Sequence, residues 1–341
     1  KRIGRYSSSN IIRKCLSIMG IAWQPTTDPP SVAGGSDAVL SIGGDIYTIR
    51  PGGNYPAGFM RFGDGCEKKG MPYVLWGASV GPFSEKLNVE KAVRKHLKRI
   101  TLITARESKT VDYLQSLNVC DNVISCADPA YVVAPEIKVN QISNGNNPTI
   151  GINLSPLSVL YTNYSLEEAI HSQAIAIENL IKSFNAKILL VPHVVCDFNE
   201  ADDDRRYLGK VKQAIATKYQ KSVSMLDNDP GFVGTKKELT KCNMVIAVRM
   251  HCAINALSAH IPTIIVSYSQ KAVGMCQYVY DSSDWVIPID QFTSEYVLGN
   301  KVRAMLEQAS VIKNYLALRI IEIQKDAYHP MQRLKSLVEK Q

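Results

Sequence analysis

The sequence predicts an α/β protein of two Rossmann-like, doubly wound domains facing a cleft. Short apolar runs rich in β-branched residues alternate with amphipathic stretches along the chain, which is typical of parallel strands connected by helices. The length of 341 residues suits two domains of roughly 150 residues rather than a single core. A polar stretch without periodicity, residues 139–148, predicts the linker between an N-terminal domain, residues 1–138, and a C-terminal domain, residues 149–300.

The first half is expected to contain four strands and three helices. The strands are short apolar runs at residues 38–42, 73–76, 101–104 and 123–125. The helices are expected at residues 10–18, 85–100 and 108–117, and Ser108 has the properties of an N-cap for the third. Residues 49–70 contain two glycine clusters, Gly52-Gly53 and Gly63-Asp64-Gly65, and are expected to form a long mobile loop, a candidate lid.

The second half repeats this alternation. Its strands are expected at residues 149–154, 187–191, 244–248, 263–266 and 285–288, and its longer helices at residues 166–184, 202–216, 252–260 and 301–325. Asp202, Asp203 and Asp204 begin one helix, where the helix dipole favours acids, so a capped helix is preferred to a metal site. Thr235 and Glu238 resemble a capping box for a short helix. The segment 301–341 is expected to pack across the hinge.

Composition excludes several classes of protein. With 45% hydrophobic and 21% charged residues the chain is globular, and it has no apolar run of the roughly 20 residues that a membrane helix needs. The first ten residues are polar, unlike a cleavable signal. The eight cysteines are scattered, which favours a reducing cytosol over a disulfide framework or a zinc site. We therefore expect a cytoplasmic location.

The net charge of +8 favours anionic partners. Four of the cations, Lys91, Arg94, Lys95 and Lys98, fall on one face of the helix expected at residues 85–100. This face is either an ordinary solvated surface or a patch that contacts an anionic membrane or a phosphorylated substrate. Nucleic acid is not an expected partner, because no basic run is interleaved with aromatic residues.

Polar and glycine residues follow each strand of the first half. They are Gly43, Gly44 and Asp45 after the first strand, Ser79 and Gly81 after the second, Arg106 after the third and Asp128 after the fourth. In open α/β sheets, ligands bind at the carboxyl ends of the strands. Arg106 adds a planar group suited to a carboxylate or a phosphate, so this edge is a candidate binding site.

The second half has a corresponding group. Arg249 and His251 lie between a predicted strand and an Ala-rich helix, where unpaired backbone N–H groups favour an anion. Tyr268 and Lys271 follow the next strand, and His193 follows an earlier one. Taken alone, Arg249 and His251 are equally compatible with an ordinary surface pair. His193 is a candidate for chemistry, with a structural histidine as the alternative.

These motifs together resemble the polysaccharide pyruvyl transferase family over residues 35–290. The resemblance rests on Gly43-Gly44, Gly77-x-x-x-Gly81-Pro82, Arg106-Glu107-Ser108, Asp128-Pro129-Ala130, Val191-Pro192-His193, Arg249-x-His251 and Tyr268-x-x-Lys271. It implies a fold similar to the two-domain GT-B glycosyltransferases. It also implies transfer of pyruvate from phosphoenolpyruvate onto two hydroxyls of a sugar as a cyclic ketal, without a metal or another cofactor. The chain departs from the family pattern before Ala38, where no Asn-x-Gly-Asp turn is found.

The resemblance also suggests roles for individual residues. His251 is expected to be the general acid/base, and Asp128 or His193 to deprotonate the attacking hydroxyl. Arg249 and Arg106 would hold the anionic groups and stabilise the departing phosphate. The remaining expected substrate contacts are Lys271, Gly43, Gly44, Asp45, Ser79, Gly81 and Tyr268.

The expected partners are phosphoenolpyruvate and a saccharide acceptor, and the basic helix is compatible with a lipid-linked acceptor at the inner face of the plasma membrane. Two alternatives stay open. One is a nucleotide-sugar glycosyltransferase of the same architecture, which would use the same cations for a diphosphate. The other is a saccharide-binding or scaffold protein without catalytic activity.

Overall fold

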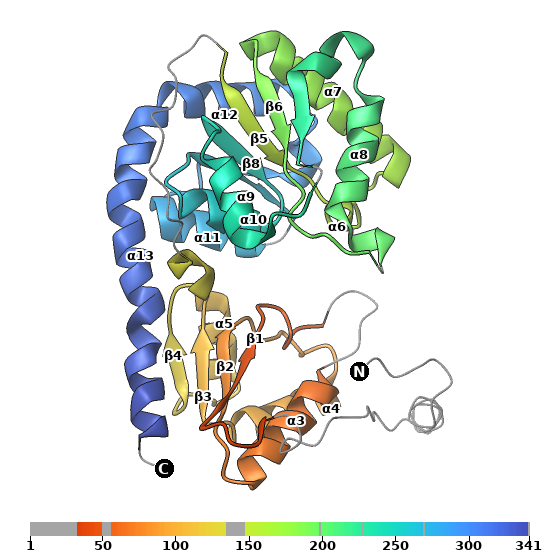
Figure 1. The fold of residues 1–341 in the computed structure, drawn as a ribbon. Helices are drawn as coiled ribbons and strands as arrows, with labels where there is room; N and C mark the ends of the chain where they lie inside the picture. The colour runs from red at the N-terminus through yellow and green to blue at the C-terminus, as the bar shows by residue number, and fades with distance from the viewer. Residues whose placement is uncertain are drawn as a thin grey trace. The chain divides into compact units, whose positions relative to one another are not determined.

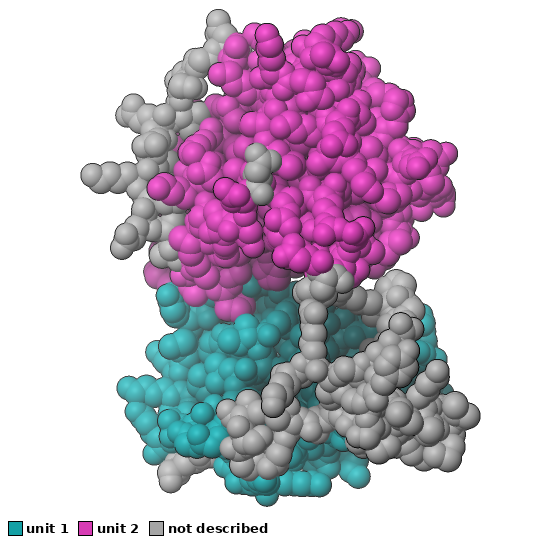
Figure 2. Space-filling view, turned by 45° about the vertical axis from the view of Figure 1, so that its right-hand side comes forward, with its two compact units in different colours: residues 1–128, 326–341 teal, residues 129–325 magenta. Residues whose placement is uncertain are grey.

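The chain folds into two compact units, each with its own parallel β-sheet. The computed structural model describes residues 33–49, 56–133, 147–197, 199–226, 228–268 and 270–339. The first unit comprises Lys1–Asp128 with Asp326–Gln341, and the second comprises Pro129–Lys325 (Figure 2). The predicted α/β class is confirmed. The helix expected at residues 10–18 and most of the expected linker lie outside the described residues.

The sheet of the first unit has four strands in their chain order. They are β1 (Val39–Ile42), β2 (Tyr73–Ala78), β3 (Leu102–Ala105) and β4 (Val123–Ser125), each parallel to its neighbours (Figure 1). The connecting helices are α3 (Ala57–Lys68), α4 (Leu87–Leu97) and α5 (Ser108–Ser116). Because consecutive strands are parallel, all four carboxyl ends meet at one edge of the sheet.

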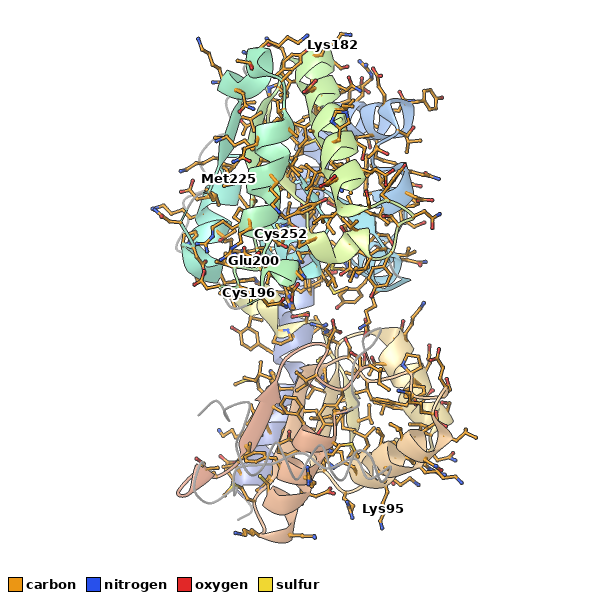
Figure 3. All side chains as sticks on the ribbon, turned by 90° about the vertical axis from the view of Figure 1, so that its right-hand side faces the viewer. Lys95, Lys182, Cys196, Glu200, Met225 and Cys252 are labelled. Carbon is orange, nitrogen blue, oxygen red and sulfur yellow. The ribbon has the colours of Figure 1, made fainter. Side chains whose placement is uncertain are left out.

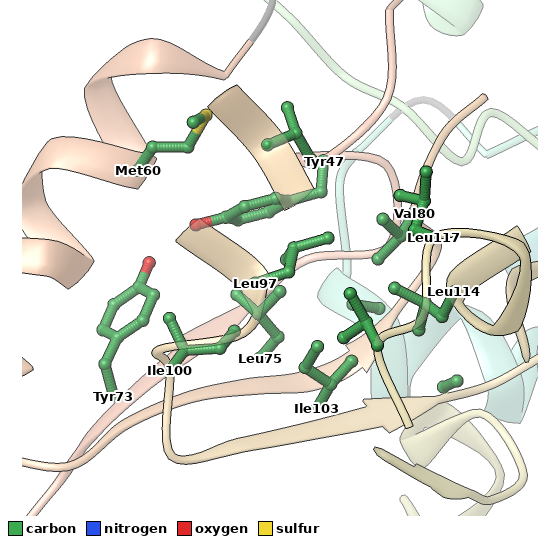
Figure 4. Packing of buried hydrophobic residues seen from close by; sticks show 14 of the residues in the cluster. Tyr47, Met60, Tyr73, Leu75, Val80, Leu97, Ile100, Ile103, Leu114 and Leu117 are labelled. Carbon is green, nitrogen blue, oxygen red and sulfur yellow. The ribbon is translucent and has the colours of Figure 1, made fainter. Parts of the chain in front are cut away.

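The core of this unit lies between the sheet and its helices. Side chains of β2, β3, α4 and α5 pack together with the loop after β1, as Figure 4 shows for Leu75, Ile103, Leu97, Leu114 and Tyr47. All five side chains are completely buried. The continuous burial of β3 explains why its sequence is an uninterrupted apolar run rather than an alternating one.

Residues 49–70 do not form the long loop expected from their glycines, because residues 57–68 are helical. Helix α3 buries Ala57, Met60, Gly63 and Cys66, which recur every three residues and so share one side of the helix. A Cβ atom on Gly63 would lie 2.6 Å from the ring of Tyr73. Gly63 therefore permits close packing of a helix rather than a turn, and the prediction of a lid here was wrong.

The six-stranded sheet of the second unit is also entirely parallel. In spatial order its strands are β7 (Val223–Met225), β6 (Lys187–Leu190), β5 (Thr149–Asn153), β8 (Met244–Ala247), β9 (Thr263–Ser267) and β10 (Val286–Pro288). This is the 3-2-1-4-5-6 order of nucleotide-binding sheets, and the order reverses between β5 and β8. The carboxyl ends of these two strands therefore flank the topological switch point.

The helices of the second unit correct two sequence predictions. They are α6 (Pro156–Val159), α7 (Leu166–Phe184), α8 (Asp204–Ala214), α9 (Gly231–Leu239), α10 (Met250–Leu257), α11 (Gln270–Tyr280), α12 (Glu295–Glu307) and the part of α13 (Ala309–Val338) before Asp326, the rest of α13 belonging to the first unit. Thr235 lies buried inside α9, so it is not a cap. The single helix expected at 301–325 is replaced by α12 and α13, which are separated at Gln308.

The acidic residues before α8 cap that helix, as predicted. The side chain of Asp203 accepts hydrogen bonds from the backbone N–H groups of Arg205, at 2.9 Å, and Arg206, at 3.3 Å. Of the helices in the described parts of the chain, none has the length and apolar character that crossing a membrane requires.

Candidate functional site

The carboxyl edge of the first sheet carries a cluster around Arg106, which we call the Arg106 cluster. It contains Arg106, Asp128, Ser79, Gly44 and Asp45. The guanidinium of Arg106 donates to Asp128 Oδ2 at 2.6 Å and to Ser79 Oγ at 3.1 Å, and it lies 3.6 Å from Asp45 Oδ1. The Arg106 side chain is only 5% exposed. Residues from the ends of all four strands thus meet here.

Gly44 leaves room for the guanidinium of Arg106. A Cβ atom at Gly44 would lie 2.1 Å from Arg106 Nη2, so a larger residue would push the guanidinium away. The carbonyl of Gly44 also accepts a hydrogen bond from the backbone N–H of Ser79 at 2.7 Å. Glycine at this position therefore lets two strand-end loops and one arginine approach one another closely.

The other two predicted glycines of this edge shape the same loops. Both have positive φ, at 148° for Gly43 and 74° for Gly81. A Cβ atom on Gly81 would lie 2.2 Å from the ring of Tyr113. These glycines are required by the backbone and by packing, and their predicted contact with substrate stays a prediction.

A buried chain of side chains anchors the loop after β1. The hydroxyl of Tyr47 lies 2.8 Å from His96 Nε2, and His96 Nδ1 lies 2.7 Å from Asp64 Oδ1. Tyr47 and His96 are almost completely buried and their rings stack with centroids 5.6 Å apart. Asp64 also pairs with Arg99. Helices α3 and α4 therefore hold the loop that carries Gly44 and Asp45.

The second sheet carries a corresponding group at its switch point, which we call the Arg249 cluster. It contains Arg249, Asp204, Asp202, Asn153 and His193. Arg249 donates to Asp204 Oδ1 from Nε at 3.1 Å and from Nη2 at 2.8 Å, and Nη2 also donates to Asp202 Oδ1 at 2.7 Å. Asp204 is fully buried, whereas the Asp202 side chain is 25% exposed. Burial alone would lower the pKa of Arg249, but the two carboxylates outweigh it and raise that pKa above its ordinary value.

Asp204 and Asn153 join the ends of three strands. Asp204 Oδ2 accepts from the backbone N–H groups of His193, at 3.2 Å, and Val194, at 3.1 Å. Asn153 Oδ1 accepts from the backbone N–H of Arg249 at 2.8 Å, and its amide donates to the carbonyl of Val191 at 2.9 Å. The geometry of the segments after β5, β6 and β8 therefore depends on two buried polar side chains.

His193 has the most perturbed histidine pKa in the described part of the chain. Burial is the main cause, with the nearby charges of His251 and Arg249, and together they lower the pKa to about 4. Its Nε2 atom is buried and has no hydrogen-bond partner among the described residues, while its ring meets Phe232 edge-on at 5.8 Å. His193 is thus a neutral imidazole at pH 7, and its buried Nε2 atom is unpaired among the described residues.

The other predicted residues of this half lie around the cluster. His251 is half-buried in the first turn of α10, and Lys271 is half-buried in the first turn of α11. The ring of Tyr268 packs against Tyr161, with centroids 4.9 Å apart. His251 is near enough to His193 to affect its pKa. Each unit thus carries its own cluster of predicted residues, with Arg106 and Asp128 in the first and Arg249 and His193, both hydrogen-bonded to Asp204, in the second.

Sequence reasoning assigned no site role to Asn153, Asp202 and Asp204. The sequence indicates these residues only through their positions. Asn153 ends a buried strand, and the two acids begin a helix at the same sheet edge. The structure brings both arginines together with carboxylates, so both guanidinium groups are already ion-paired. Asp128, a predicted base, accepts a hydrogen bond from Arg106.

In the described segments no set of three or more His, Cys, Asp or Glu side chains is arranged to hold a metal ion.

Comparisons with known proteins agree with this architecture. A family model described as polysaccharide pyruvyl transferase matches residues 1–270 of the chain. No curated protein sequence matches it.

Three similar solved structures indicate the fold. HepE from Anabaena, in complex with UDP and glucose, is 14% identical with a TM-score of 0.50, covering 80% of this chain and 75% of that one. UDP-GlcNAc 2-epimerase from Neisseria meningitidis, bound to UDP-GlcNAc, is 11% identical with a TM-score of 0.55, and the match covers 98% of this chain and 83% of that one. A putative UDP-N-acetylglucosamine 2-epimerase from Listeria monocytogenes is 10% identical with a TM-score of 0.56, and the match covers 98% of this chain and 79% of that one. The chain therefore has a GT-B-like fold of Rossmann-type domains.

Proposed function

Because the chain belongs to the polysaccharide pyruvyl transferase family, we propose that it transfers pyruvate from phosphoenolpyruvate onto two hydroxyls of a sugar. The product is a cyclic ketal on a cell-surface polysaccharide or its precursor, and phosphate is released. The observation that carries this proposal is the Arg249 cluster, which places a neutral imidazole and a fixed arginine at a topological switch point.

The reaction requires one proton to be delivered to carbon and one proton to be removed from each of the two sugar hydroxyls. The methylene carbon of phosphoenolpyruvate accepts a proton, and the first sugar hydroxyl attacks the resulting oxocarbenium-like carbon while losing its own proton. The second hydroxyl then loses its proton and forms the second C–O bond as the C–O bond to phosphate breaks, and phosphate takes the bonding electron pair. A general acid and a general base must therefore lie near the same carbon.

Two histidines of the second unit, His193 and His251, are candidates for these tasks. His251 lies in the first turn of α10 and is the proposed general acid/base. The pKa of His193 is lowered to about 4, so the imidazole is neutral at pH 7, and His193 is one candidate for the base that takes a proton from a hydroxyl. Asp128, whose carboxylate accepts a hydrogen bond from Arg106, is the other candidate.

The cations and strand-end loops would hold the charged groups of the donor. Arg249, Arg106 and Lys271 are the proposed contacts of the carboxylate and phosphate, and Arg249 would also stabilise the departing phosphate. Gly43, Gly44, Asp45, Ser79, Gly81 and Tyr268 would line the substrate site. No cofactor besides the donor is part of this scheme.

The proposed location is the cytoplasm, with contact at the inner face of the plasma membrane when the acceptor is lipid-linked. This part of the proposal is supported by α4, where Lys91, Arg94, Lys95 and Lys98 are all exposed on one face. Lys95 is labelled in Figure 3.

A second candidate is a nucleotide-sugar glycosyltransferase. The 3-2-1-4-5-6 strand order favours it, as do the similar structures that contain UDP or UDP-GlcNAc. Thermal unfolding separates the two candidates, because phosphoenolpyruvate should raise the Tm of a pyruvyl transferase and uridine diphosphate that of a glycosyltransferase.

The direct test measures phosphate released from phosphoenolpyruvate with and without galactose-, mannose- and glucose-containing acceptors. We expect release that depends on one acceptor and falls by about 10²–10⁴ in His251→Ala. His171→Ala, a substitution of an exposed histidine within α7, serves as the control and should keep the activity. If no acceptor supports release and uridine diphosphate stabilises the protein, the glycosyltransferase is the better assignment.

A further inference from the structure

Helix α13 carries apolar residues on two opposite sides. Figure 1 shows it as one continuous helix from Ala309 to Val338. One side is buried in the protein, and its members recur every three or four residues: Ile312, Leu316, Ile320, Ile323 and Ala327. A helix that only covers a core needs a single apolar side. The second side therefore indicates a further contact.

The second side of the helix, which we call the α13 seam, faces solvent. Its positions are separated alternately by three and four residues, and all of them are exposed: Val311, Asn314, Leu318, Ile321, Lys325 and Tyr328. The apolar members range from 50% exposed for Ile321 to 73% exposed for Leu318. Alternate spacing of three and four is that of two helices packed along their length. The seam runs for about 27 Å along the helix axis.

The order of apolar and polar residues in the α13 seam is the same from either end. In both directions it reads apolar, polar, apolar, apolar, polar, apolar. A surface that contacts a copy of itself across a two-fold axis must be self-complementary, because each residue and its partner exchange places. The seam meets this condition when a second copy runs in the opposite direction.

Antiparallel pairing would match the α13 seam along its whole length. Leu318 would face Ile321 of the second copy at the centre, and Val311 would face Tyr328 at each end. Asn314 would face Lys325, whose ammonium group is able to donate a hydrogen bond to the amide oxygen. Parallel pairing would instead place two Lys325 side chains together, and their like charges repel. The polar pair therefore selects one direction and one register.

We propose that two copies of this chain form a dimer through their α13 seams, packed antiparallel across a two-fold axis. A membrane surface is a poorer match, because Asn314 and Lys325 interrupt the apolar row, whereas a helix in a membrane interface keeps its polar residues on the other side. The seam is short for a specific interface, so the dimer is reversible. The inference rests on α13 alone and goes beyond pyruvyl transfer.

The experiment measures the mass of the full chain by sedimentation between about 1 and 200 μM. We expect monomer and dimer in exchange, with a Kd in the micromolar range. Ile321→Glu should raise this Kd by about 100-fold or more, because it removes apolar burial twice in each dimer. Ile175→Glu is the matched control, since Ile175 is 44% exposed on α7, and it should leave the Kd unchanged. Circular dichroism checks that each variant keeps its helices.

A second pair of variants tests the register. Asn314→Lys should weaken the dimer by about tenfold or more, because it would place a lysine against Lys325 of the second copy. Adding Lys325→Glu should restore the dimer, since each new lysine would then face a glutamate. Parallel pairing gives the opposite result for the double variant, because lysine would face lysine and glutamate would face glutamate.

Three results would overturn the proposal. A single species with the mass of the monomer at every concentration would exclude the dimer, and a dimer that Ile321→Glu leaves intact would place the interface elsewhere. Failure of Lys325→Glu to restore the Asn314→Lys variant would exclude the antiparallel register. A monomer whose binding to phosphatidylglycerol vesicles is lost in Ile321→Glu would assign the seam to a membrane surface. Sedimentation needs no turnover, so a failure of pyruvyl transfer would leave the result unaffected.

Discussion

Replacing Asp204 by asparagine should damage the second unit more than any other single change to a charge in the Arg249 cluster. Asp204 accepts hydrogen bonds from Arg249, from the backbone of His193 and Val194, and from the amide of Asn153. Asparagine keeps one oxygen but introduces an NH₂ group among these donors. The new NH₂ group would then face N–H donors in a fully buried place. Arg249 would keep only one of its two carboxylate partners, Asp202.

The size of the expected loss of stability follows from the burial of the substituted carboxylate. Removing one member of a buried, hydrogen-bonded ion pair typically destabilises a protein by about 3–5 kcal/mol. Asp202 pairs with the same arginine but is 25% exposed, so Asp202→Asn should cost about 1 kcal/mol or less. In a unit of this size each kcal/mol lowers the Tm by about 2–4 °C, so Asp204→Asn should lower it by roughly 6–20 °C and Asp202→Asn by less than about 4 °C.

The assay is thermal and urea unfolding of the two variants beside the parent protein, followed by circular dichroism. The two substitutions remove the same formal charge from neighbouring residues, so a difference between them reports burial and hydrogen bonding rather than charge alone. Equal losses of stability would refute the view that Asp204 holds the strand ends together. The double variant Asp204→Asn/Arg249→Met would show whether the loss of stability arises from the Asp204–Arg249 ion pair. If it does, the double variant should lose less stability than the sum of the losses of the two single variants.

Three further outcomes are expected. Gly44→Ala should displace the guanidinium of Arg106, destabilise the protein by about 1–3 kcal/mol and reduce phosphate release, which unfolding and activity assays would detect. The folded pKa of His193, about 4, lies below the ordinary 6.5, so its neutral form contributes roughly 3 kcal/mol of stability that is present above pH 6.5 and lost as the pH falls to 4. His193→Gln should flatten this part of the stability–pH curve, and an unchanged curve would contradict the assignment. Asp202→Asn should bind phosphoenolpyruvate more tightly by calorimetry, because it removes one of the two negative charges beside Arg249.

The strands were the most predictable part of the fold. Buried parallel strands are continuous apolar runs, and Met244–Ala247 is such a run with every residue buried. Strand β7 was missed because Val223–Met225 is only three residues long and its middle residue, Ser224, is exposed. A short strand at the edge of a sheet has too little apolar sequence to stand out from a loop.

Helix α3 escaped prediction for a different reason. Glycine is a poor helix former, so three glycines within residues 57–68 predict a loop from local propensity. The helix forms because Gly63 packs against Tyr73 and His96, which are distant in sequence. Tertiary packing overrides propensity here, and a single sequence does not show which residues will pack together.

The candidate site was predictable in position but not in its contacts. Arg106 and Arg249 were expected at strand ends because each follows an apolar run, and the structure places both there. Their partners could not be assigned, because Asp128 lies 22 positions and Asp204 45 positions away along the chain. Parallel topology brings these carboxylates to the same edge, and only the strand order determines which arginine each one meets.

The carboxylates alter what the two arginines are able to do. Each guanidinium faces two acids, Asp128 and Asp45 for Arg106, and Asp204 and Asp202 for Arg249, so each group carries a formal charge of −1.

An anionic substrate would bind either arginine by displacing one of its two carboxylate partners. The two acids in each group are unequal, because Asp204 and Asp128 are buried whereas the Asp202 and Asp45 side chains are 25% and 43% exposed. The buried acid fixes the arginine, since moving it would leave a buried charge unpaired. The exposed acid is the one that water solvates readily after displacement, so an anionic ligand would replace Asp202 in the second unit or Asp45 in the first.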